Sequence, residues 1–227
     1  LGGMRRRRPS IARRSPARHP SATLSCGGNS EPTPSYDYLP TNDYETTDRT
    51  TSLEALAGKR CPCPLQIAQN PNVGPIAGWP PHQSEDESRT IIQKVLSNPG
   101  TFAVVLKATN EAIGSIGIMS LRSATRTMSL AEGECELGFW IGEPFWGQGL
   151  IPEAVHELLR YAFEELSMSA VWCGYYEGNV KSQRTQEKCG FKYSHTEEQK
   201  PVPLLGEVCT EHFTKLTLEE WKKRRKK

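Results

Sequence analysis

The segment from residue 138 to residue 154, GFWIGEPFWGQGLIPEA, constrains the fold more than any other part of the chain. It overlaps a short aromatic and β-branched stretch, Glu136–Gly142, which is typical of a strand. Gly147 and Gly149 come next, and the residues after them have the pattern of a helix. A glycine-rich turn into a helix gathers unpaired backbone N–H groups at the positive end of the helix dipole. Such a turn suits phosphate oxygens, because glycine has no Cβ to hold a ligand away from the backbone.

The two glycines also permit simpler and more specialised interpretations. They could make a tight strand-to-helix turn and nothing more, and the loop by itself does not separate that interpretation from a phosphate site. A dinucleotide-binding loop is excluded, because Pro152 stands where G-x-G-x-x-G needs its third glycine and the preceding strands form no βαβ repeat. A Walker-type loop is excluded as well, because the Gly-Lys-Ser/Thr ending is missing.

The helix after the glycines has the clearest periodicity in the chain. Apolar residues recur three and four positions apart from Ile151 to Leu166. Pro152 falls in the first turn, where its missing N–H costs no hydrogen bond. A second helix is predicted at Asn179–Cys189, with Asn179 as its N-cap and Gly190 just beyond its C-terminus.

The remaining pattern predicts an α+β fold, in which helices interrupt a mainly antiparallel sheet. Strands at Thr101–Leu106 and Ala112–Leu121 are expected to form a hairpin around a turn at Asn110. The other predicted elements are a helix at Ser84–Leu96 and strands at Glu136–Gly142, Ala170–Tyr175, Phe191–Ser194 and Glu211–Leu216.

The chain changes character near residue 65. Residues 1–64 are rich in Arg, Ser, Pro and Thr, and no acidic residue precedes Glu31. We expect this segment to be disordered, because it cannot bury enough apolar surface to offset ordering costs of roughly 1–2 kcal/mol per residue. A transit peptide, a nucleic-acid-binding arm, a solvated tail and non-native coding sequence all stay open as explanations. Residues 65–220 are expected to form the domain, and residues 221–227 a basic tail.

Composition narrows the location and the partners. No run approaches 18 apolar residues, so no membrane association is expected. The seven cysteines are scattered without a Cys-x-x-Cys pair, which argues against a zinc site or a disulfide framework and favours a reducing, cytoplasmic location. We do not expect nucleic acid as a partner. A nucleic-acid-associated protein that uses Arg5–Arg18 and the C-terminal lysines is nevertheless a third interpretation, with steeply salt-dependent binding.

Several motifs in order resemble one known family. ELGFWIGEPFWGQGLIPEA is followed by a helix, a strand and EGNVKSQRTQEKCGF, and this succession resembles the GNAT superfamily of acetyl-CoA-dependent N-acetyltransferases. GWPPH at 78–82 and the strands TFAVVL and AIGSIGIM resemble its branch that modifies ribosomal-protein N-termini and related amines. The resemblance implies a mixed, mainly antiparallel sheet with a central splay, flanked by helices. It also implies acetyl-CoA as co-substrate and no metal.

The resemblance assigns a cofactor-binding role to the loop and the strand before it. The pyrophosphate of coenzyme A would be held by backbone amides of Phe145, Trp146, Gly147, Gln148, Gly149, Leu150 and Ile151. The family pattern prefers Arg or Gln three positions before Gly147, and Pro144 stands there instead, so one side-chain contact is missing. The strand residues Phe139, Trp140 and Ile141 would splay from Ala170–Tyr175, bond the pantetheine arm and polarise the thioester carbonyl.

The resemblance also indicates which side chains move protons. Asn179 would contact pantetheine, or serve only as an N-cap, and Ser182 would bind the cofactor and protonate the leaving thiolate. An amine must lose a proton before it attacks a thioester, and Glu136 is the candidate base. Its competing interpretations are a solvent-facing carboxylate and replacement by Glu134. Two residues that stand in GWPPH, Trp79 and His82, are candidates for the acceptor side, with a mere surface position as the alternative for the histidine.

The predicted function is therefore acetyl transfer to a primary amine by direct attack in a ternary complex, with a protein N-terminus and small molecules open as acceptors. One departure concerns the start of the domain. Family members begin with a strand and a helix, whereas DYETTDRTTSLEALAGKRCPCPL shows no clear alternation and only a short candidate helix at Ser52–Ala57. One hypothesis is that residues 1–64 come from a wrong reading frame or a mispredicted start. The alternative function is an acetyl-CoA-binding module whose catalysis is impaired because its first strand is absent.

Overall fold

The computed structural model describes residues 50–55, 65–91, 99–121, 123 and 126–226, all of which fall in one compact unit, residues 34–227. Seven strands form one sheet in the order β1-β2-β3-β4-β5-β7-β6. Only the β4–β5 pair is parallel. The strands are β1 Thr51–Ala55, β2 Thr101–Leu106, β3 Glu111–Ser120, β4 Glu134–Ile141, β5 Ala170–Tyr176, β6 Lys192–Val202 and β7 Glu207–Thr217. The predicted α+β class with a mainly antiparallel sheet is confirmed.

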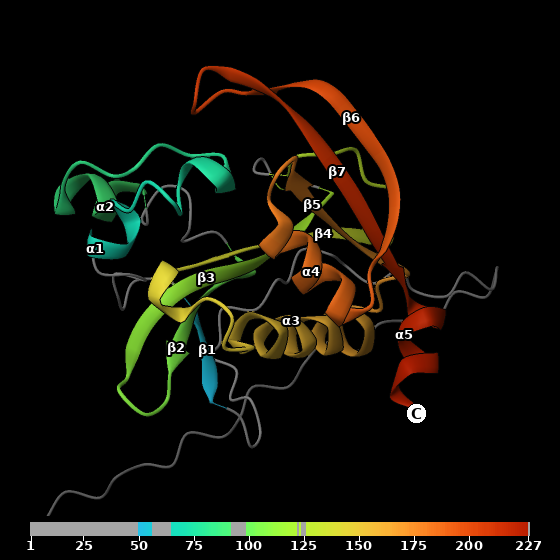
Figure 1. Cartoon of the computed structure of the whole chain (residues 1–227). Helices are drawn as coiled ribbons and strands as arrows, with labels where there is room; N and C mark the ends of the chain where they lie inside the picture. Colours follow the sequence, from blue (N-terminus) through green and yellow to red (C-terminus); the bar gives the residue numbers. More distant parts are fainter. Residues whose placement is uncertain (1–49, 56–64, 92–98, 122, 124–125, 227) are drawn as a thin grey trace, which may run out of the picture. The chain divides into compact units, whose positions relative to one another are not determined.

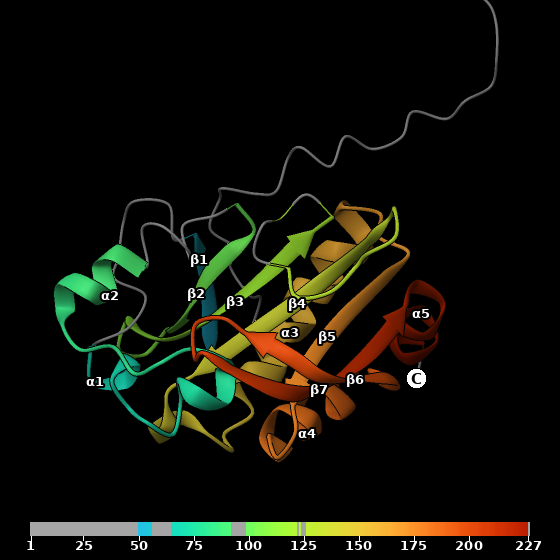
Figure 2. The same ribbon diagram turned by 90° about the horizontal axis from the view of Figure 1, so that it is seen from above.

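Helices connect and flank these strands. Figure 1 shows α3 beneath the central strands, and Figure 2 shows the strand order from above. The α-helices are α1 Leu65–Ala68, α2 Glu85–Ile91, α3 Leu150–Arg160, α4 Val180–Cys189 and α5 Leu218–Arg225. The shorter turns are two 3-10 helices, η1 Pro75–Ala77 and η3 Glu143–Phe145, and a π-helical turn, η4 Tyr161–Glu165, which continues α3.

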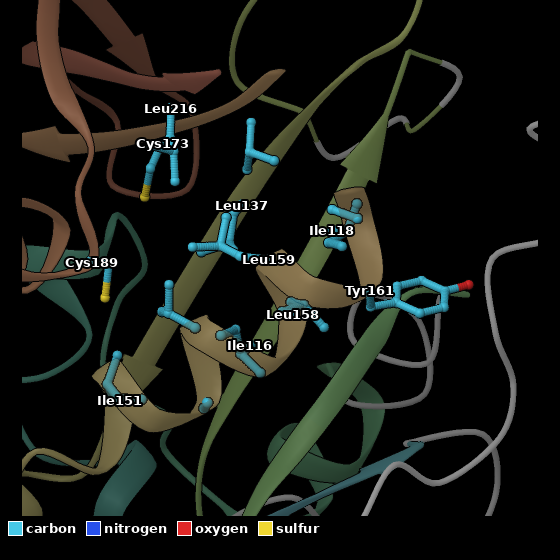
Figure 3. Packing of buried hydrophobic residues seen from close by; sticks show 14 of the residues in the cluster. Ile116, Ile118, Leu137, Ile151, Leu158, Leu159, Tyr161, Cys173, Cys189 and Leu216 are labelled. Atoms are coloured by element: carbon cyan, nitrogen blue, oxygen red, sulfur yellow. The ribbon is translucent and has the colours of Figure 1, made fainter. Parts of the chain in front are cut away.

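The core lies between α3 and the sheet. Leu158 and Leu159 point from α3 toward Ile116 and Leu137 of the central strands (Figure 3), and all four side chains are almost fully buried. The apolar periodicity in the sequence places Leu158 and Leu159 on the buried face of this helix. Since a fully buried leucine contributes about 1.5–3 kcal/mol, this interface fixes the position of the helix that follows the glycine loop.

The sheet opens at its centre, as the family resemblance implies. β4 pairs with β5 only through Glu134–Glu136 and Ala170–Trp172. Farther along, β4 stays paired with β3 as far as Ile141, and β5 stays paired with β7 as far as Tyr176. The two strands therefore separate beyond Glu136, and the end of β4 has no strand partner on that side.

The expectation that the chain lacks a first strand is wrong. Thr51–Ala55 is a strand, not part of a helix, and it pairs antiparallel with β2. Leu53 is fully buried in the core, and the N–H and Oγ1 of Thr51 each donate to Glu153 Oε1 of α3 at 2.8 Å. Contacts distant in sequence thus decide a strand that local propensity indicates only weakly. The rest of the segment 1–64, residues 1–49 and 56–64, lies outside the described residues.

The β6–β7 hairpin and the C-terminal segment also differ from the predictions. β6 and β7 are much longer than the predicted strands at Phe191–Ser194 and Glu211–Leu216. They form a hairpin of largely polar residues, so their side chains give little indication of a strand. The predicted helix Ser84–Leu96 is seen as α2 to Ile91, and residues 92–98 lie outside the described part. The expected tail from residue 221 begins within α5, where Trp221 is buried against Phe163 with ring centroids 5.1 Å apart.

Candidate functional site

The loop between β4 and α3 presents bare backbone to one side. Gly147 and Gly149 have φ values of 76° and 80°, in the left-handed region that favours glycine. A Cβ at either position would meet no atom within 4 Å. A ligand could therefore approach this stretch of backbone closely, where a side chain would otherwise stand.

The same loop leaves several donors unpaired at the helix N-terminus. Gly149 is the N-cap of α3 and supplies no side-chain cap. In the described ranges, no acceptor pairs with the backbone N–H groups of Gly147, Gln148, Gly149, Leu150 and Ile151. Because the side chains of Leu150 and Ile151 are buried in the core, only their backbone is available to a ligand. This is the geometry of an anion site.

Charges beside the loop favour an anion too. Lys181 Nζ lies 3.5 Å from the ring centroid of Trp146 and places a cation next to the loop. The carboxylate of Glu143 in this loop accepts hydrogen bonds from the amides of Asn72 and Asn70, and these bonds lower the pKa of Glu143. The loop therefore holds its one carboxylate on neighbouring amides.

Two side chains of the loop stabilise the loop itself. Trp146 Nε1 donates to the carbonyl oxygen of Ile141, and Gln148 Nε2 donates to that of Pro144, both at 2.9 Å. Phe145 packs against the core. The predicted contribution of these residues to an anion site consequently rests on their backbone.

Beyond the splay, the end of β4 has two different faces. Phe139 and Ile141 pack against the core beside α3, whereas Trp140 lies against Trp79, with ring centroids 5.6 Å apart and nearly perpendicular rings. Trp79 in turn lies 5.0 Å from the His82 ring. The structure thus brings both predicted acceptor-side residues to the face of β4 that is opposite α3.

The surroundings of His82 favour its neutral form. Its Nδ1 lies 2.8 Å from Ser88 Oγ, and the side chain is buried. Burial lowers the pKa of His82, although nearby Glu87 acts in the opposite direction. The surface position considered for this histidine is not what the structure shows.

Asn179 has two contacts at the start of α4. Its Oδ1 accepts from the Ser182 N–H at 3.1 Å, which confirms the predicted N-cap. Its Nδ2 donates to the Ile76 carbonyl at 3.2 Å and ties α4 to η1. The Ser182 hydroxyl accepts a hydrogen bond from Gln186 Nε2 at 3.1 Å. Sequence reasoning missed Gln186, because a polar residue on a helix usually faces solvent.

Glu136 is buried, and not a solvent-facing carboxylate. Only 3% of it is exposed, and its two oxygens accept from the N–H and the Oγ1 of Thr127 at 2.7 and 2.6 Å. Burial raises the pKa of Glu136 above its ordinary value, although the hydrogen bonds from Thr127 oppose the shift. A carboxylate with raised proton affinity is suited to take a proton from another group.

Glu134 differs from Glu136 in this respect. It accepts hydrogen bonds from Lys215 Nζ at 2.7 Å and from Trp172 Nε1 at 2.8 Å. Burial would raise its pKa, but these two donors outweigh burial and lower the pKa of Glu134. Of the two carboxylates, Glu136 is therefore the better suited to accept a proton.

Three further side chains near Glu136 had no signal in the sequence. Lys200 and Glu211, from the β6–β7 hairpin, form a buried ion pair with 2.6 Å between Nζ and Oε2, without hydrogen-bond alignment. Lys200 lowers the pKa of Glu136 in part. Tyr176 ends β5 beside Gly78, and burial raises its pKa to about 12. These neighbours meet only through the pairing of distant strands.

Three of the four cysteines in the described part are poorly suited to act as nucleophiles. Cys135, Cys173 and Cys189 are free and buried. Burial raises the pKa of all three thiols, that of Cys189 to about 12, so they stay protonated at neutral pH. Within the same described residues, no group of three or more His, Cys, Asp or Glu side chains could hold a metal ion. None of the described helices has the length and apolar character needed to cross a membrane.

Known proteins share this sequence pattern and this fold. The model of the acetyltransferase (GNAT) domain family matches residues 62–192, more than half of the chain. FsC-acetyl coenzyme A-N(2)-transacetylase of Aspergillus fumigatus is 27% identical over 164 residues, which are 69% of each chain. A protein of Bacillus subtilis, provisionally named a ribosomal N-acetyltransferase, is 41% identical over 58 residues, 26% of this chain and 32% of its own. A GCN5-related N-acetyltransferase from Brucella melitensis superposes with a TM-score of 0.68 at 21% identity, over 82% of this chain and 83% of its own.

Proposed function

This chain belongs to the GNAT family of acetyltransferases, whose co-substrate is acetyl-CoA, and we propose that it acetylates a primary amine by direct attack within a ternary complex. One observation carries the proposal: the splay between β4 and β5 opens beside a loop of unpaired N–H groups at the N-terminus of α3. An extended thioester with a pyrophosphate needs both features together. A loop that served only as a tight turn would need neither the splay nor the unpaired N–H groups.

The loop would bind the pyrophosphate of acetyl-CoA. The N–H groups from Gly147 to Ile151 would donate to its oxygens, and the positive end of the α3 dipole would add to the attraction. Lys181 supplies the neighbouring positive charge. The absence of a long polar side chain at Pro144 leaves the backbone as the principal source of contacts.

The separated end of β4 would hold the acyl arm. Backbone groups of Phe139–Ile141 that lack a β5 partner would pair with pantetheine amides, and one N–H would polarise the thioester carbonyl. A donor placed at a developing oxyanion contributes about 2.7–4 kcal/mol to lowering the barrier. Asn179, the N-cap of α4, would contact the arm from the β5 side of the splay.

Two side chains would move the protons. Glu136 takes a proton from the ammonium form of the acceptor, so the free amine can attack the thioester carbon. The C–N bond forms, the C–S bond breaks, and Ser182 gives a proton to the departing thiolate. The second proton that the nitrogen loses as it becomes an amide returns to Ser182 through solvent. Holding both reactants together supplies much of the acceleration. Burial and raised pKa values argue against an acyl-enzyme on Cys135, Cys173 or Cys189.

The acceptor would lie on the face of the sheet that carries Glu136, Trp140 and Trp79. The Bacillus subtilis relative is named for a ribosomal target, and the Aspergillus fumigatus relative for acetyl transfer between acetyl-CoA and an N(2) position of FsC, so ribosomal and other amines are both candidates. Thiol release measured with N-terminal peptides and with small polyamines separates them. The alternative function, an acetyl-CoA-binding module with impaired catalysis, was argued from a missing first strand, and that reason no longer applies because β1 is present. The cytoplasmic location stays a prediction.

A thermal-shift titration with acetyl-CoA tests the binding site. At about 100 times its Kd, a ligand adds roughly 2.7 kcal/mol to the free energy of unfolding, and we expect a saturable rise in Tm. Gly149→Trp should abolish the rise, because the side chain fills the open side of the loop. Gly206→Trp is the matched control: Gly206 also has a positive φ, 68°, and open space around a Cβ, but lies in the β6–β7 turn. An equal loss in both variants would refute the phosphate site.

A further inference from the structure

Gln186 is a buried amide at the centre of α4. Only 1% of it is exposed, although α4 is otherwise polar and its neighbours Lys181 and Arg184 face solvent. Burying an amide is costly unless its donors and acceptor find partners. All of them do so here, so the orientation of this side chain is fixed.

The hydrogen bonds of Gln186 determine which way the amide faces. Nε2 lies 3.0 Å from the carbonyl oxygen of Gly174 on β5, and that oxygen can only accept. The nitrogen must therefore be the atom on that side. The opposite atom, Oε1, accepts from Thr214 Oγ1 of β7 at 2.6 Å.

This orientation decides the direction of the Ser182 hydroxyl. The second N–H of Gln186 points at Ser182 Oγ, 3.1 Å away, and an amide nitrogen cannot accept a hydrogen bond. Ser182 Oγ must accept, and its own hydrogen must point away from Gln186. In the described chain, no group accepts that hydrogen, whereas the Ser182 backbone N–H is already bound by Asn179. The hydroxyl is held as an available donor at the start of α4.

We propose that Gln186 is a positioning residue, which orients Ser182 so that its O–H faces the thiolate released from acetyl-CoA. The proposal rests on the role of Ser182 in the proposed function. A hydroxyl that accepts one hydrogen bond is also polarised into a stronger donor. Gln186 itself touches neither substrate. It links Ser182 to Gly174, at the point where β5 has separated from β4.

A purely structural role for Gln186 makes a different prediction. As an anchor between α4, β5 and β7, it would affect every variant of the enzyme to the same extent. As a positioning residue for Ser182, it matters only while the Ser182 hydroxyl is present. The two roles are separated by a double-mutant cycle on kcat.

The experiment measures thiol release by the full chain at saturating acetyl-CoA and amine, for wild type, Ser182→Ala, Gln186→Met and the double variant. We expect Ser182→Ala to lower kcat at least 10-fold and Gln186→Met at least 5-fold, with the KM for acetyl-CoA within 2-fold of wild type. In the Ser182→Ala background, Gln186→Met should change kcat less than 2-fold. Gln183→Met makes the same substitution on the same helix, at an amide that bonds Glu187 and no other group of the described chain, and should leave kcat unchanged.

Each other result overturns a distinct claim. A 5-fold loss in both backgrounds makes Gln186 structural and leaves the acetyltransferase function standing. Wild-type kcat in Ser182→Ala refutes Ser182 as the donor, and the role of Gln186 with it. No wild-type turnover with any amine refutes the proposed function itself. If Gln186→Met does not fold, Gln186→Met with Thr214→Val removes the hydroxyl left without its amide partner, and the same cycle is run on that pair.

Discussion

Two glutamates that lie two residues apart on β4 have pKa values that are shifted in opposite directions. Glu136 is buried and accepts hydrogen bonds from Thr127, and burial raises its pKa. Glu134 is paired with Lys215, and its pKa is lowered. The sequence offered both as candidates for the base, and only the fold separates them.

Glu136→Gln should remove the base and keep the fold. A glutamine can accept from the Thr127 N–H and donate to Thr127 Oγ1, so the hydrogen bonds survive. We expect kcat/KM to fall about 100-fold or more, the usual scale of general base catalysis. In wild type, Glu136 gains a proton as pH falls through its raised pKa, so kcat/KM should drop on the acid side above the ordinary glutamate range. That limb should vanish in Glu136→Gln.

Glu134→Gln is the matched control for this measurement, since it makes the same change on the same face of β4. It should keep the acid limb and most of the activity. If Glu134→Gln loses the limb while Glu136→Gln keeps it, the assignment of the base is reversed.

The residues whose signal is local were predictable from sequence. Gly147 and Gly149 mark a strand-to-helix turn, and Asn179 marks a helix start, because each is required by the backbone at that position. Gln186 and Thr127 carry no such mark. Their importance comes from partners 12 and 9 residues away, Gly174 and Glu136, which meet only after the strands pair.

At the scale of elements, β1 forms one edge of the sheet. Leu53 is fully buried in the main core, while Ser52 lies on the other face and is partly exposed. Leu53→Ala should lower the free energy of unfolding by about 2–5 kcal/mol, through lost burial and the cavity it leaves. Ser52→Ala should change it by no more than about 0.5 kcal/mol. Urea denaturation of both variants measures the difference.

Equal stability of the two β1 variants would mean that residues 51–55 do not pack against the core in solution. The outcome bears on the site as well, because Thr51 donates twice to Glu153 in the first turn of α3. That turn follows the glycine loop directly. A displaced β1 would therefore release one of the contacts that hold the loop.

Elements with strong local patterns were predicted nearly to the residue, and those that depend on pairing were not. The strands Thr101–Leu106 and Ala170–Tyr176 and the helices α3 and α4 have apolar periodicity or caps, which identify them alone. β6, KYSHTEEQKPV, has no apolar alternation. It exists because its backbone pairs with β7, and a prediction from side chains stops at its first few residues.

At the scale of the whole molecule, the sheet has two functions on its two faces. One face packs α3 and fixes the glycine loop, and the other carries Glu136, Trp140 and Trp79. The splay between β4 and β5 connects the two faces. It opens the sheet between Glu136, the proposed base, and Ser182 on α4. A ligand that spans the splay should therefore affect distant segments of the sequence at once.

Hydrogen exchange of the full chain maps that effect. Without ligand, the N–H groups of residues 147–151 have no acceptor in the described chain and should exchange quickly, as should those at the free edge of Phe139–Ile141. Acetyl-CoA should slow both segments at short labelling times, because it supplies acceptors along its whole length. Residues 203–206, in the β6–β7 turn, should not change.

S-acetyl-pantetheine, which lacks the pyrophosphate, divides the site into its two parts. At saturating concentration it should slow exchange at Phe139–Ile141 and leave residues 147–151 unprotected, since only a phosphate engages the loop. Protection of the loop by this fragment would show that the glycines respond to closure of the splay and do not bind the pyrophosphate. Protection by acetyl-CoA in the β6–β7 turn alone would place the cofactor away from the splay. Protection that follows the chemical groups present in each ligand is the result that only the proposed arrangement predicts.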